Sequence, residues 1–307
     1  MISRRNIRVK VMQALYSAET DNSDFTTQKL LRMVESQLNQ TKQLFTYLVY
    51  FISEVARFAE TDALKRASKH LPSAEDLTVN TKLAGNELLW KILENKSFLD
   101  AIKTFKSESL IDKDLLKRVY VNLTQSEIYQ TYISEQSREK KSEKEIIELI
   151  FNELMLPNKD FTDHLEDFFV HWDDDADMMV LMMENFIQKP LTYNFLELIS
   201  EEKIDYSKKL AQTTFEKKDY CLEQISPKLN NWDSERIAIL DMVLMRMGLC
   251  EFLYFETIPA KVTLNEYIDL AKEYSTEQSG HFINGILDSI HKDLIETNKL
   301  NKVDYKK

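Results

Sequence analysis

Three arginines near the start of the chain have the side-chain type and spacing that a contact with nucleic acid requires. Arg4, Arg5 and Arg8 fall on one side of a helix, because residues three and four apart are neighbours on a helical surface. Tyr16 lies further along the same helix, next to that side. Arginines bind phosphates and stack on bases, and a tyrosine ring offers a surface for an unpaired base. The pattern predicts binding of single-stranded RNA, although an ordinary basic helix at a protein surface has the same composition.

Two histidines and several nearby acids are the types of residue that bind metal ions. His164 and His171 lie seven residues apart, two helical turns, with Asp163, Glu166 and Asp167 beside them. A metal site is geometrically conceivable there. A solvated acidic helix face that includes two histidines explains the same residues, and we favour that interpretation, so no metal ligand is assigned.

A third candidate is the carboxylate of Glu251, which shares a helical stripe with apolar residues such as Leu244 and Met247. A carboxylate at the edge of a core must be paired or hydrogen-bonded. One acid without a second catalytic group makes no mechanism. We therefore expect an internal ion pair or a bond to the backbone rather than an active site.

Motifs typical of enzymes are missing from the sequence. It contains no HExxH, CxxC or GxSxG, and its 4 glycines in 307 residues leave almost nothing for a nucleotide-binding loop. The same shortage argues against hairpins and an all-β fold. We expect no catalytic residue and no cofactor.

The overall charge is acidic, with 40 Lys and Arg against 51 Asp and Glu and a formal net charge of -11. RNA binding therefore needs a local basic patch, because affinity for phosphates comes from clustered cations. The two cysteines, Cys221 and Cys250, have no spacing typical of a disulfide framework and suit a reducing compartment. No leader-like apolar region opens the chain, and no apolar run reaches the ~18 residues of a membrane span. The expected location is the cytoplasm, away from membranes.

The elements that must position these residues are helices, because apolar residues recur at spacings of three and four along almost the whole chain. The predicted helices cover residues 3–19, 26–70, 75–105, 112–134, 142–156, 176–188, 191–200, 204–225, 234–255, 264–273 and 277–297. Residues 160–184 hold many acids and no Lys or Arg, which indicates a joint between two regions. Within it, Asp173 to Asp177 should begin a helix, where carboxylates favour the helix dipole.

Two capping boxes are predicted near the end of the chain. Thr263 with Glu266, and Ser275 with Gln278, each have the spacing at which two side chains satisfy free backbone donors. We expect the last two helices to begin there.

Several segments together resemble the NusB family of bacterial transcription antitermination factors. The first is Arg4 to Arg8 followed by Gln13 to Tyr16, which is similar to the family's first helix. The others are the segments 232–241, 258–275 and 279–288, in the family's order. The resemblance covers about 1–20 and 172–307 and implies an all-α fold, a NusB-like helical bundle with residues 21–171 as an inserted helical lobe.

The resemblance also implies a function. Family members bind a short single-stranded boxA element in ribosomal RNA leader transcripts together with ribosomal protein S10, and join RNA polymerase in an antitermination complex that promotes processive rRNA transcription. They catalyse no reaction.

By position, the RNA-contacting residues of the family correspond to two elements of this chain. The first helix supplies Arg4, Arg5, Arg8 and Tyr16, and the loop entering the last helix supplies Gln278, Ser279 and Phe282. Asn6 and Gln278 depart from residues common in the family, an arginine and an acid. This points to looser RNA binding alone, to stronger reliance on S10, or to contacts supplied by the insertion. Gly285, inside the last helix, is expected to allow close helix packing.

Two alternatives differ in class from an RNA-binding factor. An RNA methyltransferase can carry a similar helical domain, but it needs a glycine-rich S-adenosylmethionine site that 4 glycines cannot supply. A non-catalytic scaffold could keep the fold and use the acidic insertion as a surface for protein partners. The net charge of -11 is compatible with that second alternative.

Overall fold

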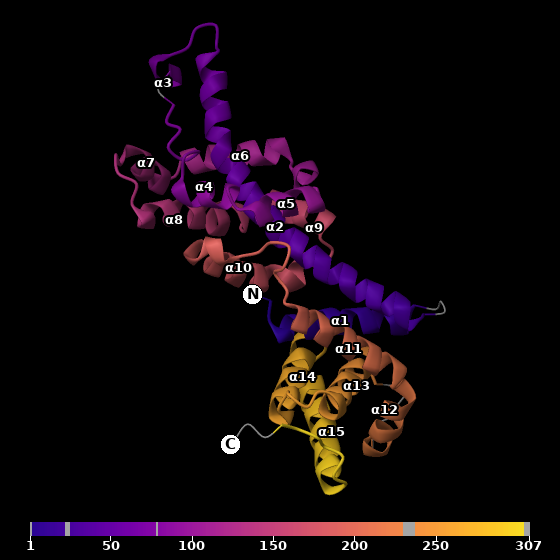
Figure 1. Ribbon diagram of the computed structural model, residues 1–307. Helices are drawn as coiled ribbons and strands as arrows, with labels where there is room; N and C mark the ends of the chain where they lie inside the picture. Colours follow the sequence, from indigo (N-terminus) through magenta and orange to yellow (C-terminus); the bar gives the residue numbers. More distant parts are fainter. Residues whose placement is uncertain (1, 22–24, 78, 230–236, 304–307) are drawn as a thin grey trace. The chain divides into compact units, whose positions relative to one another are not determined.

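The protein is built from helices. The computed structural model describes residues 2–21, 25–77, 79–229 and 237–303, and no strand occurs among them (Figure 1). The predicted all-α fold is confirmed. None of the helices in these ranges is long and apolar enough to span a membrane.

The chain divides into two compact units. Residues Asn39–Leu198 form one, which we call the lobe, and Ile2–Leu38 with Ile199–Lys307 form the other, which we call the bundle. The division on the N-terminal side falls inside helix α2 (Thr27–Ala67). The lobe thus starts and ends later along the chain than the segment 21–171, whose status as an insertion stays a prediction.

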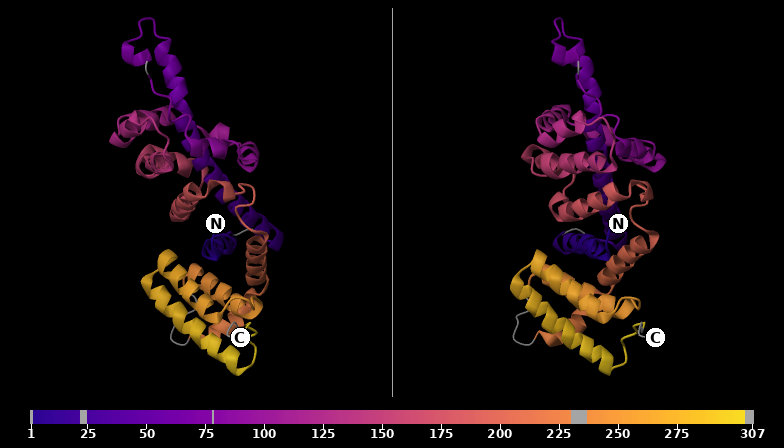
Figure 2. Two further views of the ribbon diagram at one scale, coloured as in Figure 1. Left: turned by 60° about the vertical axis from the view of Figure 1, so that its left-hand side comes forward. Right: turned by 90° about the vertical axis from the view of Figure 1, so that its left-hand side faces the viewer.

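The bundle joins the first helix to the last five. Its helices are α1 (Arg4–Thr20), α11 (Glu201–Glu216), α12 (Lys218–Ile225), α13 (Ile239–Tyr254), α14 (Ala260–Tyr274) and α15 (Glu277–Glu296). Helix α13 is central, because α1, α11, α12, α14 and α15 all pack against it (Figures 1 and 2). Its side chains are therefore buried on every side, from Val243 to Phe252.

Helix α1 begins at a side-chain cap. The Ser3 hydroxyl accepts a hydrogen bond from the Asn6 N–H at 3.2 Å, and the Asn6 side chain accepts one from the Ser3 N–H at 3.2 Å. These bonds satisfy backbone donors that a helix start leaves free. Ile7 and Val11 are fully buried, so the apolar stripe of α1 faces the bundle core as predicted.

Two glycines of the bundle permit close helix packing. A Cβ atom on Gly248 of α13 would lie 2.9 Å from Leu287 Cδ1 of α15, and one on Gly280 of α15 would lie 2.7 Å from Lys272 Cγ of α14. Gly285 differs, because nothing lies within 4 Å of a Cβ atom built there. The expectation that Gly285 serves helix packing is therefore wrong.

The lobe contains shorter helices around α2. They are α3 (Ala74–Leu77), α4 (Glu87–Leu93), α5 (Lys96–Phe105), α6 (Lys113–Thr124), α7 (Glu127–Ser134), α8 (Lys140–Leu149), α9 (Lys159–Phe168) and α10 (Trp172–Gln188). Short 3-10 turns lie at Ser107–Leu110 and Pro190–Thr192, and a π-helix, Ile150–Met155, continues α8. Aromatic rings fill part of its core. Phe45 stacks on Tyr193 and Phe195, each at 5.8 Å between centroids, and meets Phe186 edge-on at 5.7 Å.

Several predicted helix boundaries differ from the structure. The predicted helix 75–105 is three helices, since Asn86 and Asn95 each cap a new helix start with the side-chain oxygen. The predicted helix 191–200 is one turn, Pro190–Thr192, followed by irregular backbone. The predicted start of a helix at Asp173 to Asp177 is confirmed, with three acids in the first turn of α10.

Both predicted capping boxes are wrong. Thr263 lies inside α14, which begins at Ala260 after Pro259, and its hydroxyl is used in the core instead. Helix α15 is capped by Thr276, whose hydroxyl accepts a hydrogen bond from the Ser279 N–H at 3.0 Å. The first pattern, at Thr263, falls where the chain is already helical. The second, at Ser275, lies one residue before the residue that caps α15.

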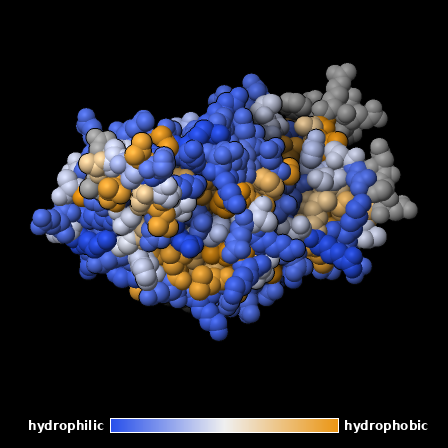
Figure 3. Space-filling model, turned by 90° about the horizontal axis from the view of Figure 1, so that it is seen from above, coloured by the Kyte–Doolittle hydropathy of each residue, from blue (hydrophilic) through white to orange (hydrophobic). Residues whose placement is uncertain are grey.

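Hydrophilic side chains cover most of the face seen in Figure 3, and hydrophobic side chains appear there in separate patches. Scattered exposed apolar residues are normal on a protein surface, whereas a gathered patch calls for an explanation.

Candidate nucleic-acid interface

The exposed arginines of α1 are held by acids from distant parts of the chain. Arg4 pairs with Glu202 of α11, and Arg5 pairs with Glu273 of α14 at 2.7 Å. The arginine side chains are 40% and 34% exposed, so both remain accessible to a ligand. Their spacing along α1 predicted the exposure but gave no sign of the acidic partners, which lie 198 and 268 residues away.

Arg8 does not belong to this exposed pair. Its side chain is 2% exposed and forms a two-pronged ion pair with Glu251 of α13, at 3.0 Å from Nε and 2.7 Å from a terminal nitrogen. The prediction that Arg8 faces RNA is therefore corrected: its guanidinium lies inside the bundle. Helical spacing alone placed it beside Arg4, but the side on which it lies meets α13. The internal ion pair expected for Glu251 is confirmed.

The Glu251 carboxylate is fully buried and surrounded by donors. Besides Arg8, it accepts hydrogen bonds from the hydroxyls of Tyr206 at 2.7 Å, Thr263 at 2.8 Å and Tyr267 at 3.0 Å. Burial by itself would raise the pKa of Glu251, but these bonds and the Arg8 charge lower it below its ordinary value. The carboxylate stays ionised and fixes α1 against α11, α13 and α14.

The Arg8 guanidinium also lies near two rings. Its carbon is 5.8 Å from the centroid of Tyr206 and 5.8 Å from that of Tyr267. Burial would lower the pKa of Arg8, yet the bond to Glu251 raises it above the usual value. A buried charge with such partners has a structural role, so Arg8 positions α1.

A second ion pair fixes the other end of α1. Glu19 accepts hydrogen bonds from Arg246 of α13 at 2.8 Å and from Lys218 of α12 at 2.6 Å. Partial burial would raise the pKa of Glu19, but the two cations lower it. With Arg8 near its start and Glu19 near its end, α1 is held at two points, and the residues between them are presented in a defined orientation.

A groove of about 470 Å³ opens beside the exposed ring of Tyr16. Helix α1 contributes Met12, Gln13 and Tyr16, the start of α13 contributes the residues from Ala238 to Leu240, and the end of α14 contributes Tyr274 and Ser275. Tyr16 is 42% exposed. The groove therefore has apolar and aromatic walls of the kind on which an unpaired base stacks.

The joint between α14 and α15 lies at the same groove through Ser275. The Ser275 hydroxyl is 3.0 Å from that of Ser279, which donates a hydrogen bond to Asp241 at 2.9 Å. Ser279 is only 7% exposed, so the prediction that it meets RNA directly is corrected: it braces the joint. Gln278 is exposed and Phe282 is half-buried, and their contact with RNA stays a prediction.

Some residues of the resemblance lie outside the part of the chain that the structure describes. Trp232 to Arg236, which precede α13, belong to that group. Tyr274, by contrast, is a groove residue that the sequence analysis missed. No signal marked it out, because it sits among ordinary apolar positions near the end of α14.

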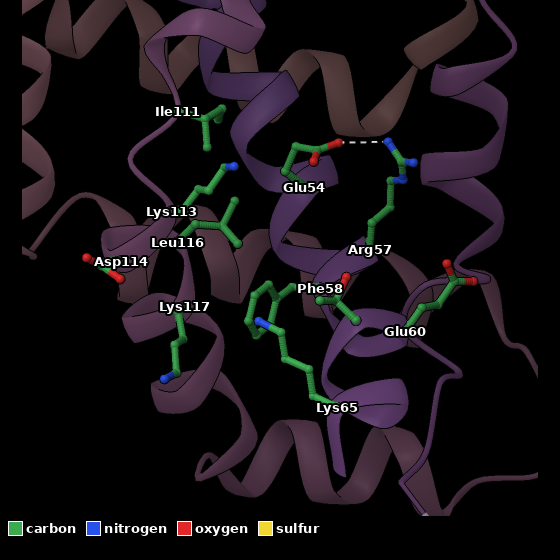
Figure 4. A pocket seen from close by; sticks show the side chains of 11 residues that line it. Glu54, Arg57, Phe58, Glu60, Lys65, Ile111, Lys113, Asp114, Leu116 and Lys117 are labelled. Atoms are coloured by element: carbon green, nitrogen blue, oxygen red, sulfur yellow. Dashed lines mark hydrogen bonds and ion pairs between the residues drawn. The ribbon is translucent and has the colours of Figure 1, made fainter. Parts of the chain in front are cut away.

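The lobe has a cleft of its own, of about 540 Å³, between α2 and α6 (Figure 4). Its cations are Arg57, Lys65, Lys113 and Lys117, and its acids are Glu54, Glu60 and Asp114. Arg57 pairs with Glu54 at 2.8 Å, and Lys65 lies over the Phe58 ring at 5.5 Å. Because acids alternate with the cations, this cleft lacks the concentrated positive charge that attracts a phosphate backbone.

The two histidines weighed as metal ligands have other surroundings. His164 Nε2 lies 2.7 Å from the Tyr47 hydroxyl, and His171 lies 3.7 Å from the carboxylate of Asp174. Burial lowers the pKa of His164. Within the described ranges, no group of three His, Cys, Asp or Glu side chains is arranged to hold a metal ion.

Comparison with known proteins gives one consistent result. The NusB family model matches residues 168–292. A protein of Salinibacter ruber named transcription antitermination protein NusB is 41% identical over 98 residues, which cover 32% of this chain and 61% of that protein. A protein of the same name from Methylacidiphilum infernorum is 45% identical over 78 residues, which cover 25% of this chain and 54% of that protein.

A longer match extends over nearly the whole of a third relative. The Fervidobacterium nodosum protein, also named transcription antitermination protein NusB, is 35% identical over 131 residues, 39% of this chain and 92% of that protein. The chain thus covers less than two thirds of the first two relatives and most of the third. No solved structure is significantly similar to the chain.

Proposed function

Since this chain belongs to the NusB family, we propose that it is a transcription antitermination factor that binds single-stranded RNA through the bundle. Its relatives carry the name of transcription antitermination proteins. We propose no catalytic step, because the chemistry at this surface consists of arginines, aromatic rings and helix ends.

One observation supports this proposal most strongly: the two predicted RNA-facing elements meet at one groove. Tyr16 of α1 and Ser275 of the α14–α15 joint both line it, although they are far apart in the sequence. Arg5 lies beside the same joint, because its partner Glu273 is near the end of α14. A strand of RNA that follows α1 would reach the start of α15.

Binding would exchange weak ion pairs for RNA phosphates. The acids that pair with Arg4 and Arg5 are 72% and 50% exposed. Exposed pairs of this kind contribute about 0–1 kcal/mol each, so phosphates can replace the carboxylates at little cost. A base can then stack on Tyr16 in the groove, while Arg8 keeps α1 in place from inside the bundle.

We further propose that the RNA is a boxA-like element of a ribosomal RNA leader, held together with ribosomal protein S10 within the antitermination complex of RNA polymerase. The pairing of Arg4 and Arg5 with Glu202 and Glu273 leaves little net positive charge at this surface. Affinity for RNA alone should therefore be modest, and a protein partner that adds contacts should raise it.

The test is a titration of labelled boxA-like RNA with the full chain, with and without S10, beside a scrambled RNA of equal length. The proposal predicts tighter binding of the boxA-like RNA, a further gain with S10, and weaker binding by Tyr16→Ala, since one stacked base contributes about 1–3 kcal/mol. Equal binding of both RNAs, unaffected by Tyr16→Ala, would contradict it.

A scaffold that no longer binds RNA is the second candidate. It is favoured by one observation, the neutralisation of both exposed arginines by carboxylates. In the titration above, a scaffold gives no binding of either RNA at low salt, where attraction between charges is strongest.

A further inference from the structure

The exposed face of α10 in the lobe carries an apolar side chain between two ends of opposite charge. Asp173, Asp177, Leu181, Asn185 and Gln188 are all exposed, and they follow one another at intervals of three and four residues, with the exposed Glu184 beside them. Such residues form one stripe along a helix. Leu181, in the middle of the stripe, is 60% exposed.

The start of this stripe is acidic. Asp173 and Asp177 are exposed, and their carboxylates form no ion pair with any described residue. Just before the helix, the side chain of Val170 is 79% exposed. The first half of the face therefore offers negative charge together with an exposed apolar group.

The end of the stripe borders a groove with a net positive lining. The groove has a volume of about 440 Å³, and its charged lining consists of four lysines, Lys91, Lys140, Lys144 and Lys189, and two acids, Glu87 and Glu143. Lys144 donates a hydrogen bond to the Gln188 side chain at 2.6 Å, which holds its charge at the end of α10. Leu191, also in the lining, is 69% exposed.

The two halves match each other by position. Asp173 lies eight residues before Leu181 and Lys189 lies eight after it (181 − 173 = 189 − 181), a distance of about 12 Å in either direction along a helix. If a second α10 lies antiparallel with Leu181 opposite Leu181, each Asp173 faces a Lys189. The same register places Asp177 opposite Asn185.

We propose that this face binds a second copy of the chain, through antiparallel pairing of two α10 helices about Leu181. A two-fold axis at Leu181 makes the interface self-complementary, since every contact occurs twice. Burial of the two leucines supplies an apolar centre, and the acid–lysine pairs at both ends fix the direction. The occupant is a second copy because a single surface offers both partners of each pair in the matching register.

Sedimentation velocity of the full chain over a wide range of concentrations tests this proposal. We expect a monomer–dimer equilibrium whose Kd rises with salt, because salt screens the end pairs. Leu181→Asp places two like charges at the axis and should raise the Kd at least about tenfold, or 1.4 kcal/mol. Leu99→Asp is the matched control, since Leu99 of α5 is also exposed but lies off α10, and it should leave the Kd unchanged.

Exchanging the charges of Asp173 and Lys189 tests whether these two residues pair across the interface or whether a substitution only disturbs the lobe. Asp173→Lys and Lys189→Asp should each weaken the dimer, and the double variant should restore it, because the exchanged charges again face each other as opposites across the axis. A chain that stays monomeric at every concentration overturns the proposal. A dimer that survives Leu181→Asp overturns it too. The same holds if the double variant has a Kd as high as the single variants while circular dichroism shows intact helices.

Discussion

The core of the bundle and the core of the lobe are stabilised by different interactions. In the bundle, the buried Glu251 carboxylate accepts bonds from Arg8, Tyr206, Thr263 and Tyr267, which come from α1, α11 and α14. In the lobe, rings of residues such as Phe45 and Phe195 stack at the centre. Stacked rings stabilise by burial of area, whereas a buried ion pair requires each donor in one place. We infer that the bundle uses its ion pair to hold α1 in register beneath the exposed arginines.

The lobe has a buried carboxylate too, that of Glu143, and its two side-chain donors are local. Glu143 accepts bonds from the Tyr132 hydroxyl at 2.9 Å, from Arg138 at 3.1 Å and from the Glu87 N–H at 2.6 Å. Tyr132 and Arg138 lie 11 and 5 residues from Glu143, whereas Arg8 lies 243 residues from Glu251. The buried ion pair of the bundle therefore joins distant parts of the chain, whereas the charged partner of Glu143 lies nearby.

The largest expected effect is that of Glu251→Gln. It removes the charge that compensates Arg8 in the core, and breaking a buried pair in this way costs about 3–5 kcal/mol. The free energy of unfolding of the bundle, measured in urea, should fall by that amount. Glu202→Gln is the control, because it breaks the exposed pair with Arg4 and should change stability by less than about 1 kcal/mol. Equal effects of the two variants would remove the contrast between buried and exposed pairs.

Acid should weaken the bundle through the same carboxylate. Because the pKa of Glu251 is lowered in the fold, the unfolded chain takes up this proton first as the pH falls. The stability it contributes is complete above the ordinary pKa of a glutamate, about 4.3, and is lost as the pH falls through the lower folded value. Wild type should lose more stability than Glu251→Gln over that range, and parallel curves would show that Glu251 is not the group responsible.

A truncation in the aromatic core of the lobe should cost less and show no such dependence on pH. Phe195→Leu keeps an apolar side chain but removes the ring that packs against Phe45 and Phe98. A decrease in the free energy of unfolding of about 1–2 kcal/mol is expected from the smaller volume. If the free energy of unfolding of Phe195→Leu fell more steeply with acidification than that of wild type, the core of the lobe would also depend on a titrating group.

The smallest expected effect is a gain in stability. Gly285→Ala adds a methyl group where nothing lies within 4 Å, and a helix interior prefers Ala to Gly by about 0.5–1 kcal/mol. Thermal unfolding should therefore shift upward. Gly248→Ala is the matched contrast, because its Cβ would lie 2.9 Å from Leu287 Cδ1, and it should destabilise the bundle by about 1–3 kcal/mol. A destabilised Gly285→Ala variant would mean that the space beside α15 is occupied.

Local patterns predicted the helices better than they predicted which way each side chain faces. The apolar stripe of α1, the helix start at Asp173 and the pairing of Glu251 all followed from spacing and burial rules. Arg8 was misplaced because the choice between surface and core depended on Glu251, 243 residues away. Ser279 was misplaced for a similar reason, since its burial depends on Asp241 of α13.

The helix caps show the same limit at short range. The pattern of Ser275 with Gln278 is a valid capping sequence, but the backbone turns one residue later and Thr276 supplies the cap. Thr263 has the right spacing to Glu266 and is nevertheless inside α14, where its hydroxyl bonds to Glu251. In both places the sequence allowed more than one helix start, and the packing of α14 against its neighbours selected the one observed.

The most direct test of the proposed RNA-binding surface compares the bundle with the lobe in one measurement. Affinity for boxA-like RNA would be measured against salt for wild type, for Arg4→Ala with Arg5→Ala on the bundle, and for Lys113→Ala with Lys117→Ala in the lobe cleft. If both arginines meet phosphates, the bundle variant binds more weakly and its salt slope falls by about 0.7 for each phosphate no longer neutralised, while the lobe variant behaves as wild type. Weakened binding in the lobe variant with none in the bundle variant would contradict the account.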